Sequence, residues 1–172
     1  MELNFALNVA FYMREYQRIN NISAHCITNS QYLYDMITKN TKLNVKVKST
    51  YVISYDEKIK TVRCTNHLII SLNNKTVIDP SYDTYVQKDR RYFTNVKDLV
   101  TYGVEFKDRT TLKEFITKYL HFEKIANDMN KGIVQVSDMK YYHDQADHME
   151  IIYKEKGDRM FYPTNQPTAL TK

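Results

Sequence analysis

Hydrophobic residues recur with a helical period through the first part of the chain. The pattern predicts one helix from Leu3 to about Arg18 and a second from about Ala24 to Lys39, with Ser23 as the N-cap of the second. The first helix has an apolar stripe made of Phe5, Val9, Tyr12, Met13 and Tyr16. One face of the second helix carries Cys26, Ser30, Leu33 and Ile37, and its apolar far end indicates that this face points inward.

The period of the pattern changes to two after residue 44, which predicts β-strands. Val45, Val47, Tyr51 and Ile53 alternate with Lys46, Lys48 and Thr50, so we expect one buried and one solvated face. A longer strand follows from Lys60 to Leu72, and Asp56-Glu57-Lys58 is expected to form the turn before it. A third strand starts at Thr76 and ends at Pro80. We expect an antiparallel meander packed on the helix that contains Cys26.

The second half of the chain has weaker signals. A helix is predicted from Thr110 to Asn130, capped by Thr110 or Thr111 and stopped by Lys131-Gly132. Edge strands are predicted at Ile133–Val136 and Glu150–Lys154. The order of elements indicates an α+β fold with a single domain over residues 1–160, followed by a frayed tail at 161–172.

Composition excludes several classes of protein. The 172 residues include only three glycines, at Gly103, Gly132 and Gly157, so neither a Walker loop nor a dinucleotide fingerprint is present. The net charge of +5 comes from 25 Lys and Arg against 20 Asp and Glu, and the basic residues do not gather on one element. The most basic stretch, Lys42 to Arg63, reads better as the solvated face of a strand than as a patch for an anionic partner. We therefore do not expect nucleic acid as a partner.

The N-terminus lacks the features of a signal peptide, because it opens with Glu2 and its apolar run is broken by Asn4 and Asn8. No stretch approaches 18 apolar residues, so no membrane-spanning segment is predicted. Two cysteines do not make a disulfide framework. These features lead us to expect a soluble protein of the cytoplasm, with no cofactor.

Three residues fit the requirements of a thiol enzyme. Cys26 begins a predicted helix, where the helix dipole favours the thiolate. His67 lies in the middle of a strand and can act as a base, and Asp79 follows the next turn and can orient that base. A three-residue turn at Asn73-Asn74-Lys75 would pair Leu72 with Thr76, which places Asp79 on the same sheet face as His67. A two-residue turn would place Asp79 on the opposite face.

At these residues the sequence resembles the transglutaminase-like branch of the papain-like cysteine enzymes. The segments that carry the resemblance are His25-Cys26-Ile27-Thr28-Asn29-Ser30, His67-Leu68-Ile69-Ile70-Ser71 and Val77-Ile78-Asp79-Pro80-Ser81. The resemblance covers roughly residues 20 to 85. It departs from the family in having no Trp after the Cys or the His, and in having His25 where a Gly often precedes the Cys.

The resemblance implies a papain-like fold and cleavage or transfer of acyl groups at amide or isopeptide bonds through a thioester. Cys26 would be the nucleophile, His67 the general base and then acid, and Asp79 the orienting carboxylate. Asn20 stands six residues before Cys26, where the papain branch has an amide side chain that helps to bind the oxyanion. A protein or peptide would be the substrate.

Other interpretations of the same residues remain. Cys26 is equally compatible with a plain core position, and Cys64 is expected in the core beside Val62 and Leu68. A zinc site built from His25, Cys26, Cys64 and His67 is disfavoured, because Cys64 and His67 point to opposite faces of one strand. His143 and His148 are expected in a surface loop. The alternative function is a catalytically inactive papain-like domain that binds a protein partner.

Overall fold

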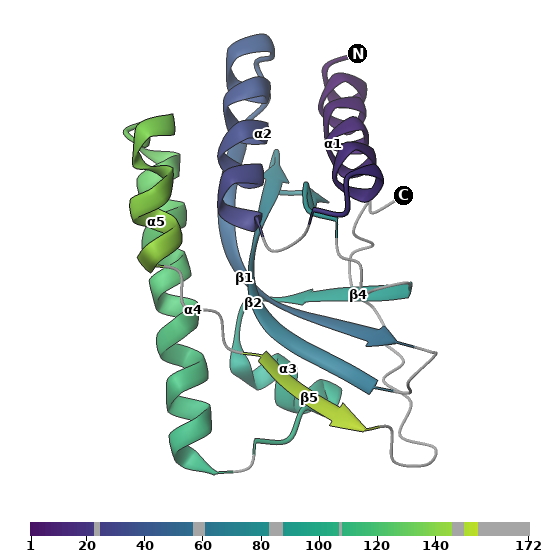
Figure 1. The fold of residues 1–172 in the computed structure, drawn as a ribbon, viewed down its shortest axis with the longest axis vertical. Coiled ribbons are helices and arrows are strands. Elements are labelled where there is room, and N and C mark those ends of the chain that lie inside the picture. The colour runs from purple at the N-terminus through teal and green to yellow at the C-terminus, as the bar shows by residue number, and fades with distance from the viewer. Residues whose placement is uncertain (23–24, 57–60, 83–87, 107, 146–149, 155–172) are drawn as a thin grey trace.

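The computed structural model describes residues 1–22, 25–56, 61–82, 88–106, 108–145 and 150–154, which form an α+β fold (Figure 1). Two helices come first, α1 (Glu2–Ile19) and α2 (Cys26–Asn40). Strands β1 (Val45–Asp56), β2 (Thr61–Leu72), β3 (Thr76–Ile78) and β4 (Lys88–Phe93) follow. The remaining elements are α3 (Val96–Tyr102), α4 (Arg109–Asn130), a 3-10 turn at Val136–Asp138, α5 (Met139–Gln145) and β5 (Glu150–Lys154).

The strands form one antiparallel sheet in the order β3-β2-β1-β4, and β5 also pairs with β2. Strand β1 pairs with β2 along its whole length, so β3 and β5 share the other side of β2. There β5 pairs with residues 61–65 and β3 pairs with residues 70–72. Among the described residues, positions 66–69 of β2 therefore have no strand partner on that side. His67 lies in this gap.

The hairpin between β2 and β3 has the register that the sequence predicts. Leu72 pairs with Thr76 and Ile70 pairs with Ile78 across a three-residue turn. Asn73 and Asn74 adopt positive φ angles of 50° and 57°, a region that Asn tolerates better than most residues. The local chemistry of two asparagines thus supports the turn length that decides where Asp79 lies.

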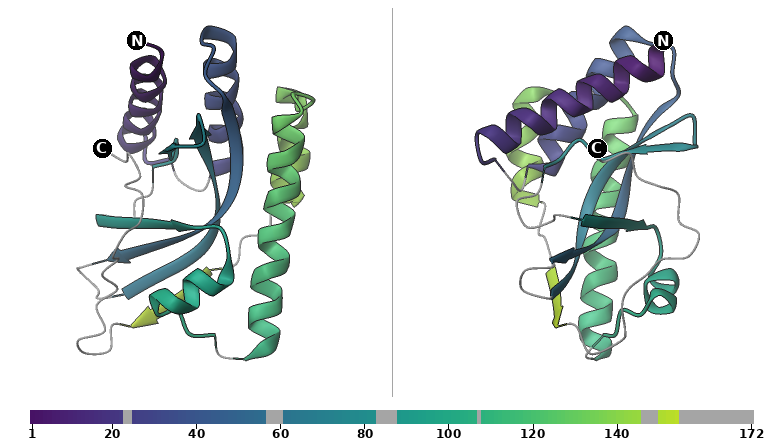
Figure 2. Two further views of the ribbon diagram at one scale, coloured as in Figure 1. Left: turned by 180° about the vertical axis from the view of Figure 1, so that it is seen from behind. Right: turned by 90° about the vertical axis from the view of Figure 1, so that its right-hand side faces the viewer.

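Two hydrophobic clusters hold the fold together. The larger one joins α1 and α2 to the β1–β2–β3 hairpins and to the C-terminal half of α4, and includes Ala6, Leu33, Ile37, Leu68, Ile70 and Phe122. The smaller one joins β1, β2 and β4 to α3 and to the N-terminal half of α4, and includes Tyr51, Cys64, Phe93, Leu99 and Phe115. Helix α4 lies along both halves, as the two further views show (Figure 2). The larger cluster packs α2 against β1 and β2.

Most element predictions are confirmed to within a few residues. The two N-terminal helices, the β1–β2–β3 meander, the long helix before Lys131 and the strand at Glu150–Lys154 are all present. Lys46 is exposed between the buried Val45 and Val47, as the alternating pattern predicts. Strand β4 and helix α3 were not predicted. The predicted N-cap Ser23 is wrong, because α2 begins at Cys26 and His25 is its N-cap. The turn expected after Asp56, residues 155–160 of the predicted domain and the tail at 161–172 lie outside the described residues.

Several predictions are wrong. Ile133–Val136 forms no strand; it leads into the 3-10 turn, which Asp138 caps by accepting a hydrogen bond from the amide of Gln135 at 2.8 Å. The N-cap of α4 is Asp108, whose Oδ1 accepts from the amide of Thr111 at 2.7 Å. His143 lies in α5 and not in a loop, while His148 is outside the described residues.

Two further corrections concern burial. Thr50, expected on the solvated face of β1, is fully buried, because it is the cross-strand partner of His67 and the segment with the buried Asp79 packs on that face. Its hydroxyl donates to the carbonyl of Phe93 in the neighbouring strand β4 at 3.0 Å. The predicted apolar stripe of α1 is buried only in part: Val9 and Met13 pack against the core, whereas Tyr12 and Tyr16 are exposed. The fully buried residues of α1 are Ala6, Ala10 and Gln17. Among the described residues, no helix is long and apolar enough to cross a membrane.

Candidate active site

Cys26 is the first residue of α2 and is 97% buried, since its relative exposure is 3%. The chain enters the helix through His25 at the N-cap, and the side chain of His25 makes no capping hydrogen bond. A helix N-terminus carries partial positive charge from its unpaired amide groups. The thiol of Cys26 therefore lies where a negative charge on sulfur is stabilised.

Asp79 binds His67 from the segment that follows β3. Nε2 of His67 lies 2.9 Å from each carboxylate oxygen of Asp79. The carboxylate is completely buried, whereas 12% of the imidazole side chain is exposed. The contact exists because the three-residue turn puts both residues on one face of the sheet. It falls within the distance range expected of a base and the group that orients it.

Cys26 contacts the same imidazole. A side-chain hydrogen bond with Cys26 is one of the interactions that raise the pKa of His67. Because Asp79 occupies Nε2, the other ring nitrogen, Nδ1, is the one left to face the sulfur. The structure thus brings three of the four residues predicted for the site into one series of side-chain contacts, from Asp79 through His67 to Cys26.

The carboxylate of Asp79 has three further hydrogen-bond donors. Arg90 Nη1 and the Tyr92 hydroxyl each donate to Oδ2 at 2.6 Å, and both come from β4. The backbone amide of Ser81 donates to Oδ1 at 2.9 Å. We call Arg90 and Tyr92 the β4 clamp. With His67, four groups therefore contact the two oxygens of this carboxylate, which holds Asp79 and His67 in place.

The electrostatics follow from these contacts. Burial alone would lower the pKa of His67, but the negative charge of Asp79, its hydrogen bond and the contact with Cys26 outweigh burial and raise that pKa to about 10. Burial alone would raise the pKa of Asp79, but the charges of His67 and Arg90 and the hydrogen bonds from His67 and Tyr92 hold it well below its usual value. At neutral pH the pair is therefore an imidazolium and a carboxylate.

Asn20 does not join this chain of contacts. It is the exposed C-cap of α1, and its amide donates to the carbonyl of Tyr16 at 2.8 Å. The buried amide near the site is that of Gln17, whose Nε2 donates to the carbonyl of Pro80 at 2.8 Å and to that of Met13 at 3.0 Å. Both donor hydrogens of Gln17 are therefore used, and the residue ties α1 to the segment after Asp79.

Cys64 lies apart from the site. It is fully buried in the smaller hydrophobic cluster, where burial raises the pKa of its thiol to about 12. The disfavoured zinc site would need Cys64 and His67 to face each other, and β2 directs them to opposite faces. Within the described residues, no group of three or more His, Cys, Asp and Glu is arranged to hold a metal ion.

Sequence reasoning missed four residues near the site. The β4 clamp has no period-2 signal, because the residues before Phe93 form a continuous polar run. Gln17 is hidden because a buried glutamine looks like any surface residue of a helix. His143 of α5 reaches the first turn of α2, where its Nε2 lies 2.7 Å from the hydroxyl of Thr28 and its ring packs edge-on to that of His25. Long-range packing alone brings these side chains together.

Comparison of the chain with protein-family models, with curated proteins and with solved structures found no match.

Proposed function

We propose that the protein is a cysteine-dependent hydrolase or acyltransferase that acts on an amide or isopeptide bond, with Cys26, His67 and Asp79 as its catalytic residues. The observation that carries the proposal is the hydrogen-bonded chain from the buried Asp79 through His67 to a cysteine at a helix N-terminus. The resemblance to the transglutaminase-like branch of papain-like enzymes supports the same assignment and the papain-like fold.

The resting state supplies a nucleophile at neutral pH. An imidazolium beside Cys26, together with the N-terminus of α2, favours the thiolate. Asp79 holds Nε2 of His67, which leaves Nδ1 available to the sulfur. The raised pKa of His67, about 10, keeps its proton available in the neutral range.

In the first half of the reaction the Cys26 sulfur attacks the substrate carbonyl and forms a C–S bond, and the carbonyl electrons move to oxygen. The backbone amides of the first turn of α2 point towards the negative charge that develops there. As the oxyanion collapses, the C–N bond breaks and His67 gives its proton to the leaving amine. The product is a thioester on Cys26 and a free amine.

In the second half, water or a second amine attacks the thioester carbonyl and loses a proton to His67. The C–S bond breaks, and the thiolate and the imidazolium are restored. Water as the acceptor gives hydrolysis, and an amine gives acyl transfer. The same residues serve both reactions, because the difference lies only in the acceptor that reaches the thioester.

Selective alkylation tests the proposal most directly. With iodoacetamide at pH 7, we expect Cys26 to be modified at least tenfold faster than Cys64, because His67 and the N-terminus of α2 favour the Cys26 thiolate, whereas the raised pKa of Cys64 keeps it as a thiol. Mass spectrometry of the digested protein assigns each site. In the variant His67→Gln the rate at Cys26 should fall at least tenfold, since the imidazolium is gone. Equal, slow labelling of both cysteines would contradict the proposal and leave Cys26 as a core residue.

Hydrolysis of fluorogenic amide substrates separates an enzyme from the alternative function, an inactive domain that binds a protein partner. The proposal expects turnover that disappears in Cys26→Ala. A reactive Cys26 without turnover of any amide or amine-acceptor pair would favour the binding domain.

A further inference from the structure

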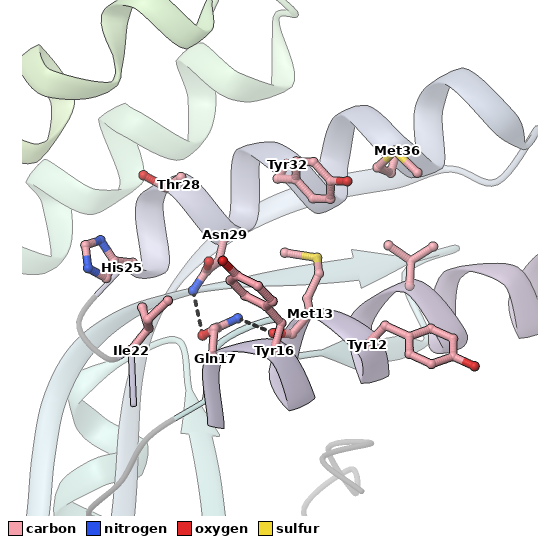
Figure 3. Close-up of a pocket in the computed structure, with 11 residues that line it drawn as sticks. Tyr12, Met13, Tyr16, Gln17, Ile22, His25, Thr28, Asn29, Tyr32 and Met36 are labelled. Atoms are coloured by element: carbon pink, nitrogen blue, oxygen red, sulfur yellow. Dashed lines mark hydrogen bonds between the residues drawn. The ribbon is translucent and has the colours of Figure 1, made fainter. Parts of the chain in front are cut away.

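A groove with a volume of about 750 Å³ lies between α1 and α2 (Figure 3). This is within the size range of pockets that bind small ligands and short peptides, roughly 300–1,000 Å³. The residues that line it include Tyr12, Tyr16 and Gln17 of α1 and His25, Asn29 and Tyr32 on the side of α2. The apolar stripe predicted for α1 forms one of its walls.

The walls of the groove are aromatic and apolar but are not covered. Tyr12, Tyr16 and Tyr32 have exposed fractions of 70%, 63% and 53%, and Met13 and Met36 also line the groove. None of the lining residues is an acid, a lysine or an arginine. Gathered apolar surface of this kind marks a binding site more often than a solvated face. Tyrosine in particular offers a large ring together with a hydroxyl, which suits contact with a peptide.

The floor of the groove is rigid and is tied to the candidate active site. Asn29 of α2 donates to Oε1 of Gln17 at 3.0 Å, which joins the two helices across the groove (Figure 3). Asn29 also donates to the hydroxyl of Ser81 at 3.1 Å, and Oε1 of Gln17 accepts from the amide of Tyr82 at 2.9 Å. The segment that carries Asp79 is therefore hydrogen-bonded to the groove floor.

One end of the groove is lined by the residue that precedes the nucleophile in the chain. His25, which lines that end, is the N-cap of α2 and directly precedes Cys26. The other end lies near Met36, and Figure 3 shows the lining side chains of α2 following one another along the helix. From His25 to Met36 the helix rises about 16 Å, since each residue adds about 1.5 Å. An extended peptide advances about 3.3 Å per residue, so about five residues fit this length.

We propose that the α1–α2 groove binds about five residues of an extended peptide with apolar or aromatic side chains, next to the bond that Cys26 attacks. This inference rests on the proposed function for the role of Cys26, but the binding itself is measurable without it. A peptide fits better than a fatty acyl chain, because the half-exposed tyrosines and the polar His25, Thr28 and Asn29 leave the occupant's polar backbone in contact with water and hydroxyl groups. Uncharged walls disfavour an acidic or basic peptide.

The test uses the full chain and a fluorescein-labelled, acetylated pentapeptide of leucine, phenylalanine and alanine, with fluorescence anisotropy as the readout. We expect saturable binding, and at least tenfold weaker binding of a pentapeptide of lysine and glutamate. Tyr32→Ala should weaken binding of the apolar peptide at least fivefold, whereas Tyr32→Phe should stay within twofold. Tyr141→Ala is the matched control, because Tyr141 is 60% exposed on α5 and does not line the groove.

Protection from alkylation connects the groove to the site. The apolar peptide at saturation should slow iodoacetamide modification of Cys26 at least threefold, and this protection should be lost in Tyr32→Ala. Equal binding of both peptides, tighter binding of dodecanoate than of the peptide, or the same loss in Tyr141→Ala would overturn the groove assignment. If Cys26 reacts selectively but no peptide protects it, the groove assignment fails and the proposed function stands. If the apolar peptide binds in the groove but Cys26 is inert, the proposed function fails and the peptide site remains.

Discussion

The hydroxyl of Tyr92 donates a 2.6 Å hydrogen bond to Oδ2 of Asp79, although β4 and β3 lie at opposite edges of the four-strand path of the sheet. The segment after β3 passes across the sheet face that carries His67, so the carboxylate reaches a strand three positions away. Arg90 approaches the same oxygen from β4. Asp79, which orients His67, is thus held by side chains of β4, the strand at the opposite edge of the sheet from β3.

The first prediction concerns this clamp. In Tyr92→Phe the carboxylate of Asp79 loses a buried, charge-assisted hydrogen bond, and we expect the free energy of unfolding to fall by about 2 kcal/mol. Urea denaturation followed by circular dichroism measures the change. Tyr32→Phe is the control, because Tyr32 is exposed and should leave stability unchanged. A Tyr92→Phe variant as stable as the wild type would show that the clamp does not hold Asp79.

The second prediction is a pH dependence. Because the pKa of His67 is raised from 6.5 to about 10 by folding, its pairing with Asp79 stabilises the fold fully below pH 6.5, and this contribution is lost as the pH rises towards 10. Folding lowers the pKa of Asp79 from 3.8, so the contribution of Asp79 to stability is present above pH 3.8 and is lost as the pH falls below that value. The stability difference between wild type and His67→Gln should therefore be largest between about pH 4 and 6.5.

Urea denaturation at steps of pH measures this difference, and it should shrink steadily from pH 6.5 to pH 10. A difference that grows with rising pH would mean that His67 is neutral in the fold. The variant Asp79→Asn should show the same pH profile, since it removes the other member of the pair.

The third prediction compares the two cysteines. Cys26→Ser should change the free energy of unfolding by no more than about 1 kcal/mol, since the replacement is nearly isosteric and lies beside a polar group, but it should abolish amide turnover. Cys64→Ser should be destabilised by about 2 kcal/mol, because it places a hydroxyl in the apolar cluster of Tyr51, Phe93 and Phe115. Denaturation and turnover measured on both variants make the comparison. The reverse pattern would identify Cys26 as the structural cysteine.

The fourth prediction separates Asn20 from Gln17. Asn20→Ala should leave turnover within twofold, since its amide is exposed and bonded to Tyr16. Gln17→Ala should lower the free energy of unfolding by about 3 kcal/mol, because it removes the buried link to Pro80, leaves the Tyr82 amide without its acceptor and takes one of the two acceptors from Asn29. A large loss of turnover with normal stability in Asn20→Ala would restore the oxyanion role that the resemblance implies.

Short-range patterns made much of the fold predictable from the sequence. The helical period placed Cys26 in the first turn of α2, and the three residues Asn73-Asn74-Lys75 set the register that puts Asp79 on the face of His67. Both depend on interactions within a few residues of the chain, namely helix geometry and the tolerance of Asn for positive φ. The N-cap of α4 was misplaced because Asp, Thr and Thr compete over four positions, and only the formed turn selects Asp108.

What the sequence by itself determined is therefore the identity of three residues and the elements on which they lie. Only the tertiary structure decided which further side chains meet them. Arg90 and Tyr92 come to Asp79 because β4 joins the sheet beside β1, and Gln17 reaches Pro80 because α1 packs on α2. The tertiary structure also decided that Tyr12 and Tyr16 line an open groove while Ala6 and Ala10 are buried. Helix α1 has apolar residues on two sides, and either side could have packed against the rest of the protein. The close approach of α1 to α2 favours the side with small residues.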